Sequence, residues 1–167
     1  MMINKKILNT LLKIVPKDKD IVIVNIGTDA VMFDSLAPLI GSYLEEKDIN
    51  MKVYGTLDRP IHAIRIHECF DNLAENHPND FVIGIDACNS SKRELGEIFI
   101  QNVGVHPGRG VGKELPVIGD ISILGVTSQH GYNSLIRLNT IIKMANDIVD
   151  TLVEFDKIRN EVLLNEN

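Results

Sequence analysis

Short apolar runs alternate with amphipathic segments along most of the chain, and this alternation predicts an α/β fold. Runs without internal polar positions are typical of strands buried on both faces, whereas apolar residues three and four apart mark one face of a helix. Strands are expected over residues 21–26, 51–54, 81–85, 96–101 and 121–126. Helices are expected over residues 3–15, 36–46, from about 60 to 73 and from 135 to 152. Strands that alternate with helices favour a parallel sheet.

Each expected helix has a defined apolar row that should face the core. In the first helix, which Pro16 closes, the row is Ile3, Ile7, Leu11 and Ile14. In the helix that begins near Pro60, with Asp58 as a cap, the row is Ala63, Ile66, Phe70 and Leu73. The row of the last helix is Leu135, Leu138, Ile142, Ala145, Val149 and Leu152, and docking of a partner helix is an alternative use of it. Beyond Asp156 the polar tail, residues 157–167, is expected to fray.

Length and charge narrow the class of protein. A chain of 167 residues fits one domain, with a core over about residues 20–156. The net charge of −6 argues against a broad nucleic-acid-binding surface. Cys69 and Cys88 form no metal-type or redox-type pair, so a reducing cytoplasm is expected. No apolar run approaches the roughly 20 residues of a membrane span, and the start of the chain reads as an amphipathic helix rather than a signal peptide.

Asp34 lies between the first strand and the helix that follows it. Pro38 must lie in the first turn of that helix because it has no N–H to donate, so Asp34 is at or next to the N-cap. This position is just beyond the carboxyl end of a strand, where ligands bind in open α/β sheets. Asp34 is therefore either a capping carboxylate or a catalytic or metal-binding group.

A second carboxylate follows another apolar run in the same way. The run 81–85 ends at Asp86, so two acidic side chains are expected at the carboxyl ends of two strands. If these strands are neighbours, their ends lie about 5 Å apart in the pairing direction. We expect Asp34 and Asp86 to face one cleft, which favours the functional interpretation of both.

Other polar residues give weaker signals. The segment 103–116, which contains His106 and Arg109, is rich in glycine and is expected to be a lid or a substrate-contacting loop rather than a phosphate cradle. Cys88 could be a thiol nucleophile with His62 or His130, but a half-buried inert cysteine is the simpler interpretation. Asp29, Asp58 and Asp120 are interpreted as caps or loop anchors, and no role is indicated for His67, His77 or His106.

Several motifs resemble a known family. Residues 33–39, Phe-Asp-Ser-Leu-Ala-Pro-Leu, and residues 84–87, Gly-Ile-Asp-Ala, resemble the two aspartate motifs of the spore germination protease superfamily. The chain resembles most closely the short YyaC-type sporulation proteins of that superfamily. The motifs shared with them lie at residues 54–57, 60–63, 86–88, 107–116, 119–120 and 138–140.

The resemblance implies a fold, a site and a biological setting. It implies a three-layer α/β/α architecture with a mostly parallel sheet of about five strands, like that of the hydrogenase-maturation endopeptidases. It implies a cytoplasmic endopeptidase of an endospore former, with Asp34 and Asp86 as the catalytic pair and small acid-soluble spore proteins as substrates. His62, Arg109 and His130 are expected to line the substrate site. No cofactor, nucleic acid or membrane is expected.

Two carboxyl groups in contact share one proton, so one can act as a general base on water while the other protonates the carbonyl oxygen. The helix N-terminus favours an anion, which makes Asp34 the candidate base and Asp86 the candidate acid. Two alternatives stay open. A divalent metal could be held by Asp34, Asp86 and His130. Phe33 and Ala37 replace residues that are usually glycine, and the activation pro-segment of the longer protease is not recognised, so the chain could instead bind a peptide without cleaving it.

Overall fold

Six strands form one central sheet in the computed structural model, which describes residues 2–62, 64–108, 114–130 and 134–165. The strands are β1 (Ile21–Ile26), β2 (Lys52–Tyr54), β3 (Phe81–Asn89), β4 (Ile98–Gln101), β5 (Ile121–Gln129) and β6 (Ser134–Leu135). Their order is β2-β1-β3-β5-β4, with β6 paired to β5. The pairings β2–β1, β1–β3 and β3–β5 are parallel, whereas β4 and β6 run antiparallel to β5. The prediction of a mostly parallel sheet is confirmed.

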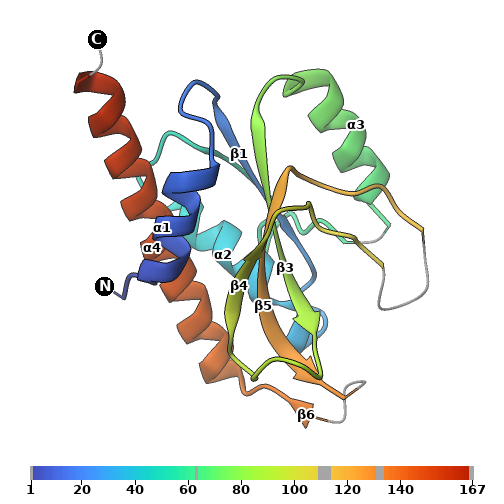
Figure 1. Cartoon of the computed structure of the whole chain (residues 1–167). Helices are drawn as coiled ribbons and strands as arrows, with labels where there is room; N and C mark the ends of the chain where they lie inside the picture. The colour runs from blue at the N-terminus through green and yellow to red at the C-terminus, as the bar shows by residue number, and fades with distance from the viewer. Residues whose placement is uncertain (1, 63, 109–113, 131–133, 166–167) are drawn as a thin grey trace.

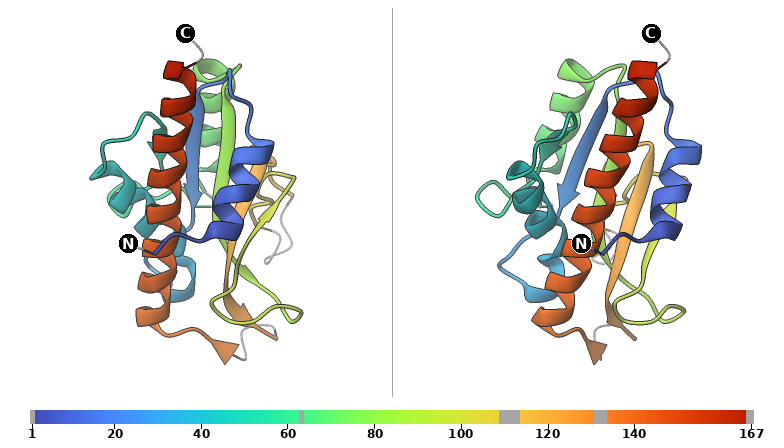
Figure 2. Two further views of the ribbon diagram at one scale, coloured as in Figure 1. Left: turned by 60° about the vertical axis from the view of Figure 1, so that its left-hand side comes forward. Right: turned by 90° about the vertical axis from the view of Figure 1, so that its left-hand side faces the viewer.

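Helices cover both faces of the sheet and complete the three layers that were expected (Figure 1). Helices α1 (Lys5–Ile14), α2 (Leu36–Glu45) and α4 (Leu138–Asn165) lie on one face, and α3 (Ile66–Asn76) lies on the other. Figure 2 shows α1 beside the long helix α4. A short 3-10 helix, η1 (Met32–Asp34), precedes α2. No helix in the described part of the chain combines the length and apolar character that a bilayer span requires.

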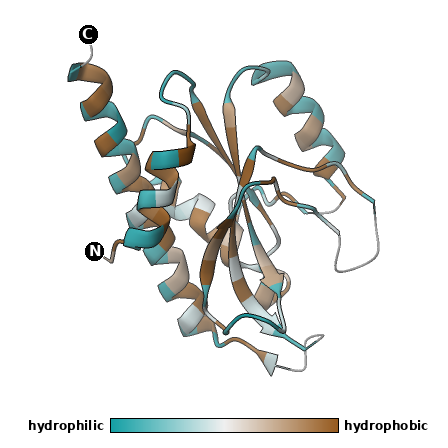
Figure 3. Ribbon diagram, viewed as in Figure 1, coloured by the Kyte–Doolittle hydropathy of each residue, from teal (hydrophilic) through white to brown (hydrophobic). Residues whose placement is uncertain are grey.

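The apolar runs form strands because both faces of the sheet are covered. All residues of β1 are buried, and its apolar residues alternate between two apolar clusters. Ile21 and Ile23 pack in the cluster beneath α1, α2 and α4, whereas Val22 and Val24 pack in the cluster beneath α3. This two-sided burial explains why the strand lacks the apolar–polar alternation of a half-exposed strand, and much of the central sheet is accordingly brown in Figure 3.

Two strands continue beyond the points at which their apolar runs end. β3 extends to Asn89 rather than ending at Asp86, and β5 extends to Gln129 rather than to Val126. Residues from Asp86 onward leave the core, and β3 continues there because β5 still pairs with it, for example Cys88 with Val126. The end of an apolar run therefore marks the limit of burial and not the end of the strand.

Helix α3 starts at Ile66, so the predicted start near Pro60 is wrong. The preceding segment is held in an extended path instead, because Ile61 pairs with Ile26 and accepts a hydrogen bond from the Gly27 N–H at 2.8 Å. The buried row also differs from the prediction: it is Ile66, Cys69 and Leu73, whereas Phe70 is 43% exposed. Ala63 lies outside the described residues.

The first and last helices form as predicted, but their buried faces and their ends differ from the prediction. In α1 the buried residues are Ile7, Leu8 and Leu11. Helix α4 starts at Leu138, so Leu135 belongs to β6 and both leucines are about half exposed. Its buried row is Ile141, Met144, Ala145, Ile148, Val149, Thr151, Leu152, Phe155 and Asp156. The helix also continues to Asn165, past the point where fraying was expected, and Arg159 donates hydrogen bonds to the carbonyls of Pro16 and Lys17 at 2.6 and 2.9 Å.

A close approach between α2 and the end of β2 fixes the position of α2 and of the residues before it. A Cβ atom at Gly41 would lie 1.9 Å from the carbonyl oxygen of Gly55, and Gly55 itself has φ +81°. The fully buried Asn25 side chain joins this contact by donating to the Tyr54 carbonyl at 2.9 Å. Helix and strand end can meet at this distance only if position 41 has no side chain.

Replacing Gly41 with alanine should therefore destabilise the protein, although alanine is the better helix former. Forcing a methyl group against backbone should cost about 2 kcal/mol or more in the free energy of unfolding, as measured by urea denaturation. Gly125→Ala is the matched control, because the new methyl group would meet the ends of the Leu36 and Met144 side chains, which can shift. A Gly41→Ala variant as stable as the parent would show that α2 is not held in this way.

Candidate functional site

Asp34 lies in the loop between β1 and α2, held by a hydrogen-bonded turn. The Thr28 N–H donates to the carbonyl oxygen of Asp34 at 3.2 Å and to its carboxylate oxygen Oδ2 at 3.1 Å. The N-cap of α2 is Ser35, so Asp34 is next to the N-cap, as predicted. Among the described residues, its carboxylate accepts a hydrogen bond from the Thr28 N–H and not from an N–H of the helix, which argues against the capping role.

Gly27 makes this turn possible. The loop folds back so tightly that a Cβ atom at Gly27 would lie 2.3 Å from the carbonyl oxygen of Asp34. The backbone of Gly27 also adopts φ +149°, a value that residues with side chains rarely reach. A glycine directly after the strand thus allows Asp34 to return to the strand end.

Asp86 reaches the same region from β3. In the parallel ladder it lies opposite Ile26, the last residue of β1, and opposite Leu124 of β5. It is the first residue of β3 to leave the buried part of the strand and is partly exposed. The short helix η1, which contains Asp34, contacts both β3 and β5. The structure therefore brings Asp34 and Asp86 to one end of the sheet.

The two carboxyl groups share an unusual electrostatic environment. Burial raises the pKa of Asp34 to about 6, and the hydrogen bond from Thr28 opposes part of this effect. The pKa of Asp86 is raised well above its usual range, first by burial and then by the negative charge of Asp34, against a smaller opposing effect of the Ala87 backbone. Asp34 therefore ionises first and Asp86 keeps its proton at higher pH, which is the order expected for a base and an acid in one pair.

The other predicted site residues are His62, His130 and Arg109, and the first two lie in the described part of the chain. His62 follows Ile61 at the carboxyl end of β1, is partly exposed, and its Nδ1 accepts from the Ile64 N–H at 3.4 Å. His130 follows β5, is exposed, and has φ 51°. Arg109 lies outside the described residues, as do residues 110–113 of the segment that was expected to be a lid.

The described residues contain no group of three side chains that would support the metal-binding alternative. Within residues 2–62, 64–108, 114–130 and 134–165, no group of three or more His, Cys, Asp and Glu side chains is arranged to hold a metal ion. In particular, His130 does not join Asp34 and Asp86 in such a group.

Cys88 and Asp120 have structural explanations, whereas the predicted cap or anchor roles of Asp29 and Asp58 stay predictions. Burial, together with the charge of Asp86, raises the pKa of Cys88 to about 11, so the thiol is a poor source of thiolate. Asp120 accepts a hydrogen bond from the Val82 N–H at 2.8 Å, which agrees with its interpretation as a loop anchor. Asp29 and Asp58 are exposed.

One polar network was not anticipated from the sequence. His77 accepts or donates hydrogen bonds on both ring nitrogens, to the Tyr54 hydroxyl at 2.8 Å and to the Asp80 carboxylate at 2.7 Å. It joins the end of α3 to β2 and the start of β3, at the amino end of β3, opposite to the end that carries Asp86. In the sequence, the only indication of this network is that the acidic residue Asp80 follows His77 by three positions at the end of a helix.

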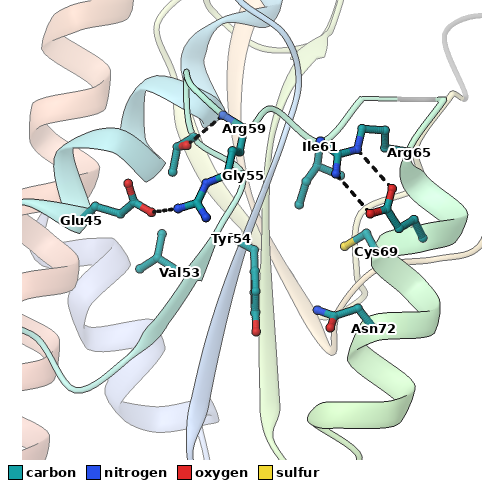
Figure 4. Close-up of a pocket in the computed structure, with 11 residues that line it drawn as sticks. Glu45, Val53, Tyr54, Gly55, Arg59, Ile61, Arg65, Cys69 and Asn72 are labelled. Atoms are coloured by element: carbon teal, nitrogen blue, oxygen red, sulfur yellow. Dashed lines mark hydrogen bonds and ion pairs between the residues drawn. The ribbon is translucent and has the colours of Figure 1, made fainter.

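A separate pocket of about 270 Å³ opens between β2 and α3 (Figure 4). Two ion pairs lie in its wall, Arg59 with Glu45 and Arg65 with Glu68, at 3.1 and 3.2 Å. Neither Asp34 nor Asp86 lines it. The pocket is therefore distinct from the aspartate pair, although Ile61 belongs to its wall and also pairs with the end of β1.

Comparisons with known proteins support the fold and establish the family. The hydrogenase maturation protease HycI of Thermococcus kodakarensis KOD1 has the same fold, with a TM-score of 0.56 and 18% identity over 83% of this chain and 93% of that one. The germination protease of Clostridium perfringens (strain SM101 / Type A) is 27% identical over 175 residues, which covers 90% of this chain and 54% of that protein. The chain thus spans about half the length of that relative.

Two further matches identify the family. The protein YyaC of Bacillus subtilis (strain 168), described as uncharacterized, is 37% identical over 145 residues, or 83% of this chain and 71% of that protein. The family model described as "Protein of unknown function (DUF1256)" matches residues 1–151. The chain therefore belongs to the DUF1256 family, and its relation to YyaC confirms the resemblance seen in its motifs.

Proposed function

We propose that this chain is an endopeptidase that hydrolyses peptide bonds with Asp34 and Asp86. The observation that carries the proposal is the electrostatic coupling of two carboxyl groups from separate segments at the carboxyl end of the sheet, each with a raised pKa. Desolvating a carboxylate without a compensating partner destabilises a protein, and pairs of acids with raised pKa values are typical of active sites. The relation to a germination protease supports the same conclusion.

In the proposed reaction the two residues have different roles. Ionised Asp34 takes a proton from water, and the water oxygen bonds to the peptide carbonyl carbon while Asp86 donates its proton to the carbonyl oxygen. The tetrahedral intermediate then collapses as Asp34 passes its proton to the leaving nitrogen and Asp86 recovers the proton from the oxygen. Each aspartate ends in the state in which it began, and no further group is required.

The proposed substrates are proteins made during sporulation, and small acid-soluble spore proteins are the first candidates. This choice rests on the resemblance to the germination protease and on the relation to YyaC. We place the activity in the cytoplasm of an endospore former on the same basis, with His62, Arg109 and His130 as proposed contacts to the substrate.

Cleavage should depend on both aspartates. A recombinant small acid-soluble spore protein should be cut by the parent chain, and Asp34→Asn and Asp86→Asn should each slow cutting by about a hundredfold or more, as followed by mass spectrometry. Asp29→Asn is the matched control, because Asp29 is an exposed acid in the same loop. Equal cutting by the parent and both pair variants would rule out the proposal. Aspartate-dependent binding without turnover would favour a peptide-binding protein, and loss of activity on treatment with EDTA would favour the metal-dependent alternative.

The pH dependence of cleavage should report the pair. Activity requires Asp34 ionised and Asp86 protonated, so the rate should fall on the acid side with a midpoint near pH 6, the pKa of Asp34. It should fall again on the alkaline side, where Asp86 loses its proton. The measurement is kcat/KM against pH in buffers of constant ionic strength. A rate that stays flat from pH 5 to 7 would contradict the role of Asp34.

The same pair should make the protein less stable as pH rises. The folded-state pKa values of both acids are raised, so the folded state binds more protons than the unfolded chain above about pH 4, and stability declines through and beyond pH 6. Asp86→Asn removes the contribution of Asp86 to this loss of stability. The variant should be more stable than the parent at pH 8 by about 1 kcal/mol or more, and the difference should shrink toward pH 4. Thermal unfolding at several pH values measures this, with Asp29→Asn again as control. A difference that does not change with pH would contradict the burial of an ionisable pair.

A further inference from the structure

Strand β3 is longer than β1, and this difference leaves part of its edge open beside the aspartate pair. The ladder between β1 and β3 ends with Ile26 opposite Asp86. β3 continues through Ala87, Cys88 and Asn89, which pair only with β5 on the opposite side. In the described part of the chain, no strand lies against the β1-facing edge of residues 87–89.

The backbone groups that face this edge can be assigned from the alternation of the strand. The Phe81 N–H donates to the Asp20 carbonyl on the β1 side, so odd-numbered residues of β3 face β1. The Ser90 N–H donates to the Ser128 carbonyl, so even-numbered residues face β5. The carbonyl of Ala87 and both backbone groups of Asn89 therefore point to the open side. The register shift at this point lies in β5, where Thr127 is the additional residue, and leaves the alternation of β3 intact.

The chain that could have closed this edge turns away from it. If β1 continued, the Thr28 N–H would face β3, but it donates instead to Asp34. The following residues lead to η1, which contacts α2 and α4 as well as β3 and β5, so the loop packs on one face of the sheet instead of continuing the ladder. The place in line with β1 thus begins at Asp86 and lies next to the loop that carries Asp34. In that loop the apolar residues Val31 and Met32 are 39% and 42% exposed.

We propose that an extended polypeptide segment binds as an added strand along residues 87–89 of β3, with its end nearest β1 beside Asp86. Unpaired backbone N–H and C=O groups in strand geometry are recognised by the backbone of another extended chain. The apolar side chains of Val31 and Met32 favour apolar side chains next to the bond that is cut. The inference rests on the proposed function and specifies its substrate class, which is an unfolded or disordered segment rather than a folded protein.

The test uses fluorescein-labelled casein, an unfolded polypeptide, with binding measured by fluorescence anisotropy in an Asp34→Asn background that prevents cleavage. Asn89→Pro removes the outward N–H and should weaken binding about tenfold. A proline is tolerated at a strand edge when its nitrogen faces away from the partner strand, and the Asn89 nitrogen faces away from β5. Asn89→Ala keeps the N–H and should bind within about twofold of the parent. Equal binding by the two Asn89 variants, or no binding of casein to the Asp34→Asn parent, would overturn the inference.

A second measurement avoids the risk that the proline variant folds poorly. Hydrogen exchange of the Asn89 amide, followed by NMR in the Asp34→Asn chain, should slow when unlabelled casein is added, whereas unchanged exchange would overturn the inference. The outcomes separate the two proposals. If cleavage depends on the aspartates but is unaffected by Asn89→Pro, the proposed peptidase activity stands and the proposed added strand is rejected. If Asn89→Pro weakens binding but the chain with Asp34 intact shows no cleavage, the proposed added strand stands and the proposed peptidase activity is rejected.

Discussion

The site depends on the register between two parallel strands. Because Ile26 is opposite Asp86, the last residue of β1 marks the level at which β3 leaves the core. Gly27 then allows the chain to return, and the Thr28–Asp34 hydrogen bonds hold the second carboxyl group at the same end. A shift of the ladder by one residue would turn Asp86 to the opposite face of the sheet. The pairing that stabilises the sheet therefore also assembles the pair of acids.

The surrounding layers supply the environment that these acids need. Helices α2 and α4 bury one face of the strands, and α3 buries the other, so the carboxyl groups lie where the low-dielectric core meets solvent. Burial there raises both pKa values, and the charge of one acid adds to the shift of the other. This arrangement reduces stability at neutral pH, as is common where a function requires a strained or desolvated group. Among the described residues, no strand pairs with the β1-facing edge of residues 87–89 next to the pair, which is where we propose that a substrate backbone binds.

Much of this could be predicted from the sequence, because burial on two faces leaves a clear apolar signal. The apolar runs predicted β1 to β5 and a mostly parallel sheet, and with Pro38 they predicted that Asp34 and Asp86 lie at one end of it. The short strand β6 was not predicted, because Leu135 was assigned to the last helix. The ends of β3 and β5 did not, because polar residues such as Asn89 pair through backbone groups that leave no pattern in the sequence. The start of α3 was misplaced because Ile61 pairs with Ile26, a contact between distant segments. The partly buried His77 network could not be predicted either, since His77 follows α3 whereas its partner Tyr54 lies on β2, far away in the sequence.

The most direct test of the account is an NMR titration of the Asp34 and Asp86 carboxyl carbons in the parent and in Asp34→Asn. The account predicts that Asp34 titrates near pH 6, that Asp86 titrates higher, and that the pKa of Asp86 falls when the Asp34 charge is removed. Two independent titrations near the ordinary aspartate value of about 4, unaffected by the substitution, would contradict it.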